Sequence, residues 1–305
     1  MLDLLLLLLT LALGALLSRV SLCAVAGMQQ AISLRNYAGL ERLLIAASGA
    51  GISLLLLAGL RPDQVWLPRD AHFHLGIIGG GLLLGLGAMV NGGCYLGSVL
   101  YLGTGNLNFL LTLAGIGLGL RAADSWAPLP SVATPSLTMA MGPLWLAGLA
   151  AFVLIIAVLT YHRRIKGQWL ALLAGLLAGL VYARRPGWSY GSTLESLARG
   201  QLGLAQWRGE LSALALFVGA IGAAVLAGEF RLQRPTPWRA LRCLSGGVIL
   251  GFGAALIPGG NDSLLLWAIP GLTLYGASAF GLMLGAIGLG FGLAERGQRQ
   301  PPLAR

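Results

Sequence analysis

The sequence predicts an all-α integral membrane protein with about nine transmembrane helices, short re-entrant or half helices, and two inverted pseudo-symmetric repeats. Three observations support this fold class. Hydrophobic residues make up 57% of the 305-residue chain and charged residues only 10%, with a mean hydropathy of +0.81, a balance foreign to water-soluble domains. Apolar runs of spanning length follow one another along the chain. A glycine-rich motif also recurs at a fixed interval.

The apolar runs divide into nine main spans and four weaker segments. The main spans cover residues 2–17, 39–60, 74–90, 107–120, 142–160, 168–183, 211–228, 243–257 and 272–293. The weaker segments, at 23–34, 95–102, 190–197 and 263–269, are too short to cross a bilayer and are expected to be re-entrant or half helices. The first span resembles a lipoprotein signal but has no basic start and no small residue before Cys23, so we expect it to be retained.

The repeat is visible as GGLLLGLGA at 80–88, which recurs as GGVILGFGA at 246–254, an offset of 166. With a one-residue slip, NGGC at 91–94 matches PGGN at 258–261. We therefore assign 1–121 to a first repeat, 142–160 to a connecting helix, 168–293 to a second repeat, and 294–305 to a cytoplasmic tail. A single connecting span would invert the second repeat relative to the first.

The basic residues predict an orientation. When YHRRIK at 161–166 is placed in the cytoplasm, 13 of the 20 basic residues fall inside and seven outside, with Arg184 and Arg185 on the unfavourable side. This places the N-terminus outside and the C-terminus in the cytoplasm. The basic residues are scattered, with no aromatic-interleaved stripe, so nucleic acid is not an expected partner; the lipid bilayer is.

Polar or glycine-containing breaks interrupt the apolar runs twice in each half. Broken helices at membrane depth are tolerated only where the backbone is buried or lines a cavity, so we expect the four breaks to converge on a substrate path. Thiols, hydroxyls, an amide and backbone N–H groups suit an anion, and thiols suit a polarisable one. The candidate substrate-binding residues are Cys23, Cys94, Asn91, Gly92, Gly93, Ser189, Gly259, Gly260, Asn261 and Asp262.

Each of these residues also has a structural interpretation. The three cysteines, including Cys243, could be small buried hydrophobes. Asp262 could mark an ion or proton pathway, or it could be the N-cap of a half helix starting at Ser263. His72 and His74 could attract an anion or be incidental at a helix entrance. Five tryptophans are expected in the interfacial belt: Trp66, Trp126, Trp145, Trp169 and Trp188.

Enzyme signatures are missing from the sequence. HExxH and P-loop motifs do not occur, and GxGxxG-like runs lie inside apolar spans, where they are packing patterns. The cysteines have no zinc-ligand spacing and no CxxC pair. We therefore expect no enzymatic activity, no metal and no cofactor.

At three stretches the sequence resembles the YeeE/YedE sulfur-transport family, which includes bacterial thiosulfate transporters. These are RVSLCAVAG at 19–27, GLLLGLGAMVNGGCYLGS at 81–98, and GGVILGFGAALIPGGNDSLLLWAIPGL at 246–272. The resemblance implies an hourglass-shaped protein of the bacterial inner membrane with a waist lined by thiols that pass thiosulfate along. Cys23 and Cys94 match the first-half positions, whereas Gly260-Asn261 stands where the family carries another Gly-Cys.

The leading hypothesis is a permease for a small sulfur-containing inorganic anion, with thiosulfate first. A second hypothesis is a membrane sulfur relay, in which a cysteine persulfide delivers sulfur to a cytoplasmic sulfur-carrier protein. A third is a permease for another anion or for selenium species, because the second-half cysteine is missing.

Overall fold

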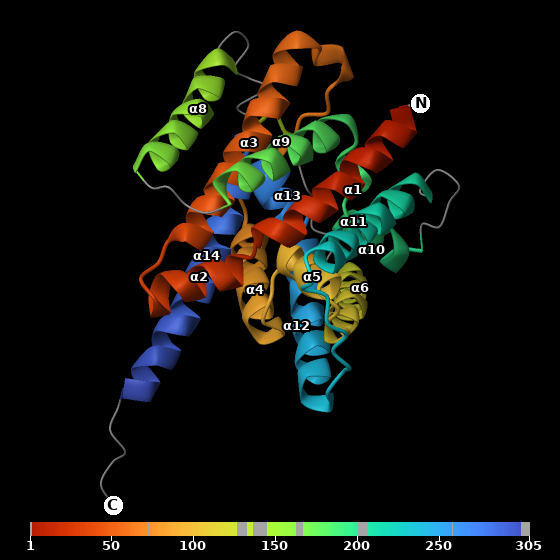
Figure 1. Ribbon diagram of the computed structural model, residues 1–305, viewed down its shortest axis with the longest axis vertical. Coiled ribbons are helices and arrows are strands. Elements are labelled where there is room, and N and C mark those ends of the chain that lie inside the picture. Colours follow the sequence, from red (N-terminus) through yellow and green to blue (C-terminus); the bar gives the residue numbers. More distant parts are fainter. Residues whose placement is uncertain are drawn as a thin grey trace, which may run out of the picture.

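The structure is a computed structural model that describes residues 2–71, 73–126, 133–136, 145–162, 167–200, 207–257 and 259–299. Helices account for nearly all of this part of the chain (Figure 1). Its strands are two-residue segments, β1 (Asp70–Ala71) and β2 (Ala133–Thr134), which pair antiparallel. The prediction of an all-α protein is confirmed. His72 and residues 163–166 and 300–305 lie outside the described residues.

Long helices match each of the nine predicted spans. They are α1 (Leu2–Val20), α3 (Ala38–Leu60), α4 (Leu75–Asn91), α6 (Asn108–Trp126), α8 (Trp145–His162), α9 (Gln168–Arg184), α11 (Trp207–Leu226), α12 (Pro237–Ala255) and α14 (Leu274–Arg299). The weaker segments form short elements: α2 (Ala24–Ser33), α5 (Tyr95–Gly103), α10 (Tyr190–Ala198), and α13 (Asn261–Ser263), which continues as the π-helical turn η4 (Leu264–Ala268). Two 3-10 turns, η1 (Pro62–Gln64) and η3 (Pro186–Trp188), join neighbouring helices.

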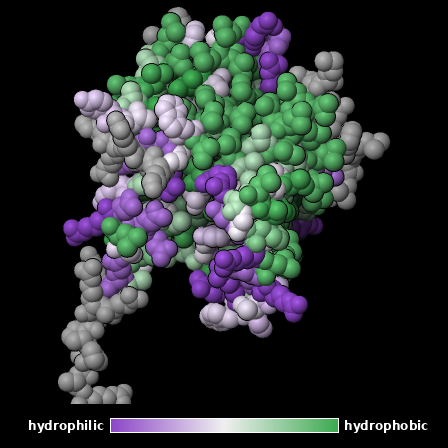
Figure 2. All heavy atoms as spheres, viewed as in Figure 1, coloured by the Kyte–Doolittle hydropathy of each residue, from purple (hydrophilic) through white to green (hydrophobic). Residues whose placement is uncertain are grey.

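Within the described residues, four helical stretches are long and apolar enough to cross a membrane. These are Leu4–Ser33, Ala38–Leu60, Leu75–Gly103 and Leu274–Glu295, with shorter apolar helices at Trp145–Tyr161, Gln168–Arg184 and Glu210–Leu226. Leucines on α1 and valine and leucine on α8 are half exposed or more, and a broad hydrophobic surface covers much of the face in Figure 2. An apolar exterior of this extent is typical of a protein solvated by lipid.

The order of helices repeats along the chain. Four pairs begin 166 residues apart: α1 and α9, α2 and α10, α5 and α13, and α6 and α14. The remaining long helices, α3 and α11 and then α4 and α12, keep the same order with starts shifted by a few residues. The offset seen in the glycine motif therefore extends to the secondary structure of both halves.

Each of four closely packed helix pairs joins one helix of the first half to one helix of the second half. Helix α1 packs on α11, and its counterpart α9 packs on α3; likewise α4 packs on α14, and its counterpart α12 packs on α6 (Figure 1). Glycines permit these close crossings. A Cβ on Gly81 would lie 2.7 Å from the Ala279 carbonyl oxygen, and one on Gly247 would lie 2.5 Å from that of Thr112. Small residues at helix crossings are typical of membrane proteins.

One prediction about the membrane interface is wrong. Trp188, assigned to the interfacial belt, is only 2% exposed, because η3 turns its indole inward against Tyr182, with ring centroids 5.1 Å apart. Trp66 and Trp169 are exposed, as a belt position requires. The side chain of Trp126 lies outside the described residues.

Candidate functional site

The break between α1 and α2 places Cys23 at a helix start. Ser21 adopts φ +56°, a left-handed conformation that ends α1 without a glycine. Cys23 then has the extended backbone of an N-cap residue, and α2 begins at Ala24. The Cys23 side chain is 1% exposed, so the turn holds the thiol in the protein interior.

The break between α4 and α5 places Cys94 in the same role. Gly92 takes the left-handed conformation at φ +76°, which ends α4, and Cys94 is the N-cap of α5. The N–H groups of Gly92 and Gly93 both bond to the Ala88 carbonyl, at 2.9 and 3.0 Å. We expected these N–H groups to be free donors; in the structure the turn that caps α4 uses them.

The two thiols meet at the centre of the protein. Cys94 Sγ lies 3.9 Å from Cys23 Sγ, both cysteines are free, and Cys94 is fully buried. Gly97, one turn into α5, makes room for the pair, because a Cβ there would lie 2.5 Å from Cys23 Sγ and 3.7 Å from Cys94 Sγ. This explains the spacing of glycine after cysteine in the first-half motif, a role that the sequence analysis did not assign to Gly97.

Asn91 lies beside the thiols but its amide is occupied by the protein. Its Nδ2 donates to the Gly93 carbonyl at 2.6 Å, and its Oδ1 accepts from the Thr112 hydroxyl at 2.6 Å. Cys243, buried on α12, directs its thiol to the Asn91 carbonyl at 4.0 Å. Asn91 and Cys243 therefore fix the end of α4.

In the second half, Ser189 and Gly260 occupy the N-cap positions of α10 and α13. Ser189 Oγ accepts a hydrogen bond from the Ser192 N–H at 3.2 Å. These N-caps lie 166 residues after Cys23 and Cys94, so Cys94 corresponds to Gly260, not to Asn261 as the one-residue slip suggested. The N-cap interpretation of Asp262 is also wrong, because α13 begins earlier, at Asn261, and no side chain caps it.

Tyr95 joins the two halves at the first residue of α5. Its N–H donates to Asn261 Oδ1 at 2.9 Å, and its carbonyl accepts from the Tyr190 hydroxyl at 2.7 Å. All three residues are buried. The role of Tyr190 was not predicted, because a tyrosine in a short apolar segment carries no local signal for a contact 95 residues away.

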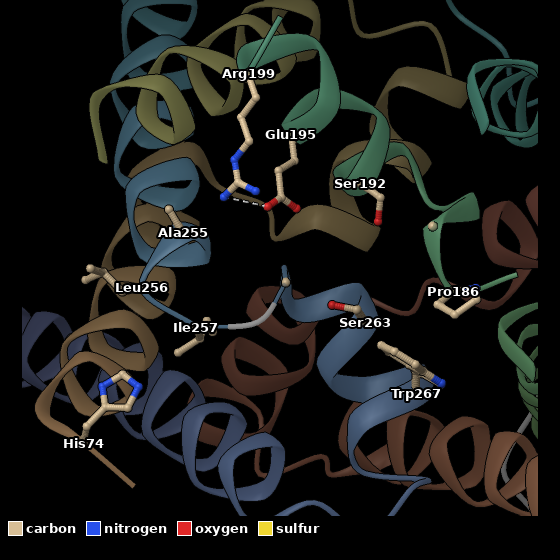
Figure 3. Close-up of a pocket in the computed structure, with 12 residues that line it drawn as sticks. His74, Pro186, Ser192, Glu195, Arg199, Ala255, Leu256, Ile257, Ser263 and Trp267 are labelled. Carbon is tan, nitrogen blue, oxygen red and sulfur yellow. Dashed lines mark ion pairs between the residues drawn. The ribbon is translucent and has the colours of Figure 1, made fainter. Parts of the chain in front are cut away.

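A cavity of about 440 Å³ leads toward this centre from one side (Figure 3). A smaller cavity of about 20 Å³ continues from it to Tyr95 and shares several residues with it. Ser189, Gly191 and Gly260 line the smaller cavity, while neither thiol lines either one. The residues shared by both cavities are Ser192, Glu195, Gly259 and Ser263.

The opposite side of the centre is closed by aromatic packing. A Cβ on Gly93 would lie 3.1 Å from the Tyr101 ring and 3.2 Å from the Phe109 ring. The two rings stack with centroids 4.8 Å apart. Trp267, which occupies the position of Tyr101 in the second half, instead lines the large cavity. Among the described residues, the two cavities that approach the centre therefore lie on the second-half side.

Charges at the large cavity are arranged around Arg199, the C-cap residue of α10. Its guanidinium pairs with Glu195 at 3.0 Å and with Asp124 at 3.3 Å. His74 also lines the cavity, and its Nδ1 accepts from the Gly76 N–H, so the ring caps α4. Deeper in, Asp262 is 3% exposed and its Oδ1 has no hydrogen-bond partner among the described residues. No group of metal-ligating side chains occurs in the described part of the chain.

An apolar helical exterior and helix breaks that meet at a buried centre beside a cavity are typical of membrane transporters, and comparisons with known proteins identify the family. The model of the Sulphur transport family matches residues 19–289, so the chain belongs to the YeeE/YedE sulfur-transport family. The thiosulfate transporter TsuA of Spirochaeta thermophila is 29% identical over 242 residues, which cover 66% of this chain and 72% of that protein. The resemblance predicted from the motifs is confirmed, as is the expectation that the chain is a transporter and not an enzyme.

Proposed function

We propose that the protein is a permease for a small sulfur-containing anion, with thiosulfate as the leading substrate, and that the anion passes between the two halves past Tyr95. The observation that carries this proposal is the pair of free thiols 3.9 Å apart at the starts of α2 and α5. A helix start favours negative charge, and an S–H group is a weak donor suited to a polarisable sulfur atom. The relative named as a thiosulfate transporter supports this choice of substrate.

In this proposal the first part of the path is lined by oxygen-containing groups and the second part by the two thiols. The anion enters the large cavity, passes Ser189, Gly260 and Asn261, and reaches Cys94 and Cys23. Asp262 borders the first part of this path, while Asn91, Gly92, Gly93 and Gly259 shape the helix ends around it. Separation of the Tyr101 ring from Gly93 would then open the opposite side.

The membrane arrangement is part of the same proposal. The two halves are inverted repeats, the nine long helices cross the inner membrane, and α8 is the connecting helix. The exchange of packing partners between halves supports this arrangement. With the N-terminus outside and the C-terminus in the cytoplasm, the large cavity opens outward and the structure is the outward-open state.

The sulfur-relay alternative is less favoured. Cys23 and Cys94 are 1% and 0% exposed, so a soluble sulfur-carrier protein has no access to either thiol in this conformation. A relay would leave a persulfide on one of them after exposure to thiosulfate, because the thiolate would take the outer sulfur atom and release sulfite. Intact-protein mass spectrometry distinguishes the two functions, because a permease carries its substrate without such an adduct.

The decisive experiment is uptake of radiolabelled thiosulfate by proteoliposomes that contain the full chain, its Cys94→Ala variant or its Cys243→Ala variant. A hydrogen bond to a charged group contributes roughly 1.5–3 kcal/mol, so Cys94→Ala should lower uptake roughly ten- to a hundredfold. Cys243→Ala is the matched control, because Cys243 is equally buried but its thiol is directed to the Asn91 carbonyl and is not part of the thiol pair. Equal uptake by all three proteins would exclude the thiol path.

A further inference from the structure

The second-half side of the path carries a carboxyl group that an anion permease does not obviously need. Asp262 is 3% exposed, and its Oδ1 has no hydrogen-bond partner among the described residues. No salt bridge in that part of the chain reaches it. Transfer of an unpaired carboxylate from water into such an environment is costly, and intramembrane carboxyl groups commonly belong to ion or proton pathways.

The N–H groups of Asp262 and Ser263 and the Ser189 side chain interact with the Asp262 carboxyl, but no cation among the described residues pairs with it. Tyr95 from α5, Tyr182 from α9 and Tyr190 from α10 surround the carboxyl, and all three are neutral phenols. Glu195 on α10 also lies near Tyr95, but its carboxylate is paired with Arg199. Arg199 is already paired with Glu195 (Figure 3), and it pairs with Asp124 as well. A dianion that approached Tyr95 would therefore meet a carboxylate that has no paired cation among the described residues.

The carboxyl lies directly against the proposed path. A Cβ on Gly191 would lie 3.6 Å from both Asp262 carboxyl oxygens, and one on Gly260 would lie 2.7 Å from Oδ1. Gly191 and Gly260 both line the small cavity that leads to Tyr95. Asp262 itself lines neither cavity, so the two glycines lie between its carboxyl and the small cavity.

A line of hydroxyl groups connects Asp262 to the large cavity. Ser192 lines that cavity and its Oγ lies 3.1 Å from Ser189 Oγ. Ser189 in turn interacts with the Asp262 carboxyl through its side chain. Hydroxyl groups both donate and accept hydrogen bonds, so this pair provides a route for a proton from water in the cavity.

We propose that Asp262 binds one proton together with the anion, so that transport of the dianion is coupled to protons. The proton passes from cavity water through Ser192 and Ser189 to the Asp262 carboxylate, which becomes a neutral acid. The neutral acid removes the repulsion and offers an O–H donor to an oxygen atom of the substrate. The site rests on the proposed function, since it needs an anion in the path.

The test measures proton uptake when thiosulfate is added to the purified full-length protein in weakly buffered detergent solution with a pH indicator. Thiosulfate is the anion of a strong acid and stays a dianion throughout, so it binds no proton itself. The wild-type protein should take up about one proton per bound anion, and above the range in which Asp262 is protonated the Kd should rise about tenfold per pH unit. Asp262→Asn should bind thiosulfate without taking up protons.

Glu195→Gln is the matched control, because it removes a cavity carboxylate that Arg199 already neutralises; proton uptake should persist in it. Wild-type binding without proton uptake, or undiminished proton uptake by Asp262→Asn, would overturn the inference while leaving the permease intact. Absence of thiosulfate binding to the wild-type protein would instead refute the proposed function, and the proton site with it. If Asp262→Asn does not fold, proton uptake by the wild-type protein alone decides the question.

Discussion

The Tyr95 N–H group donates a 2.9 Å hydrogen bond to Asn261 Oδ1, and the two residues lie 166 positions apart, the interval that relates the two halves of the chain. Each is the first residue of the short helix in its own half, α5 or α13. The bond therefore joins corresponding positions of the two halves at the centre of the protein. Tyr95 lines the small cavity and directly follows Cys94, so the bond lies between that cavity and the pair of thiols.

Replacement of Asn261 by alanine should destabilise the protein. The buried Tyr95 N–H would lose its acceptor, at a cost of about 1–3 kcal/mol. Thermal unfolding in detergent measures this effect. Asn36→Ala is the control, because Asn36 Oδ1 accepts an equivalent bond from the Ala38 N–H at an exposed position, where water replaces the lost partner. Equal stability of the two variants would show that the Tyr95 bond contributes nothing.

Replacement of Gly97 by alanine should impair transport. The added Cβ would lie 2.5 Å from Cys23 Sγ, and relief of such overpacking requires displacement of the thiol, at a cost of about 1–3 kcal/mol. We expect thiosulfate uptake to fall at least about tenfold. Gly281→Ala on α14 is the control, since a Cβ there meets nothing within 4 Å. Normal uptake by Gly97→Ala would mean that the spacing of the thiols is not critical.

Substitution by phenylalanine should lower the unfolding free energy at one buried tyrosine, Tyr190, but not at another, Tyr182. Tyr190→Phe removes the 2.7 Å bond to the Tyr95 carbonyl and should cost about 0.5–1.5 kcal/mol of unfolding free energy. Tyr182→Phe removes a buried hydroxyl that has no partner among the described residues, so it should be neutral or stabilising. Thermal melts of both variants side by side check this pair. A larger loss for Tyr182→Phe would contradict the assigned hydrogen bonds.

The proposed orientation predicts which loops face outward. The native cysteines are buried, so single exposed cysteines can be introduced at Asp63, after α3, and at Pro235, before α12. In intact cells a membrane-impermeant maleimide should label Asp63→Cys, and it should label Pro235→Cys only after lysis. Labelling of both positions from the same side would contradict an odd number of crossings between them. The reverse pattern would invert the orientation.

Much of the site was predictable from local sequence. Glycines at 92–93 and 259–260 within apolar runs identified two of the helix breaks, and Cys23 and Cys94 were placed at helix starts. The polar bonding was not predictable. The amide of Asn91 and the N–H groups of Gly92 and Gly93 are used by the protein itself, because the left-handed turn at Gly92 folds them back onto their own helix end.

The sequence by itself determined the helical membrane class, the extents of the helices, the interval of 166 between the halves and the family. These follow from local hydropathy, glycine content and motif spacing, which are properties of neighbouring residues. The tertiary structure alone decided that Cys23 meets Cys94 across Gly97, that Tyr190 supports Tyr95, that Trp188 is buried, and that Asp262 is buried with its Oδ1 unpartnered among the described residues. Such contacts join residues far apart in the chain, and their geometry depends on how the helices cross, which local sequence patterns do not specify.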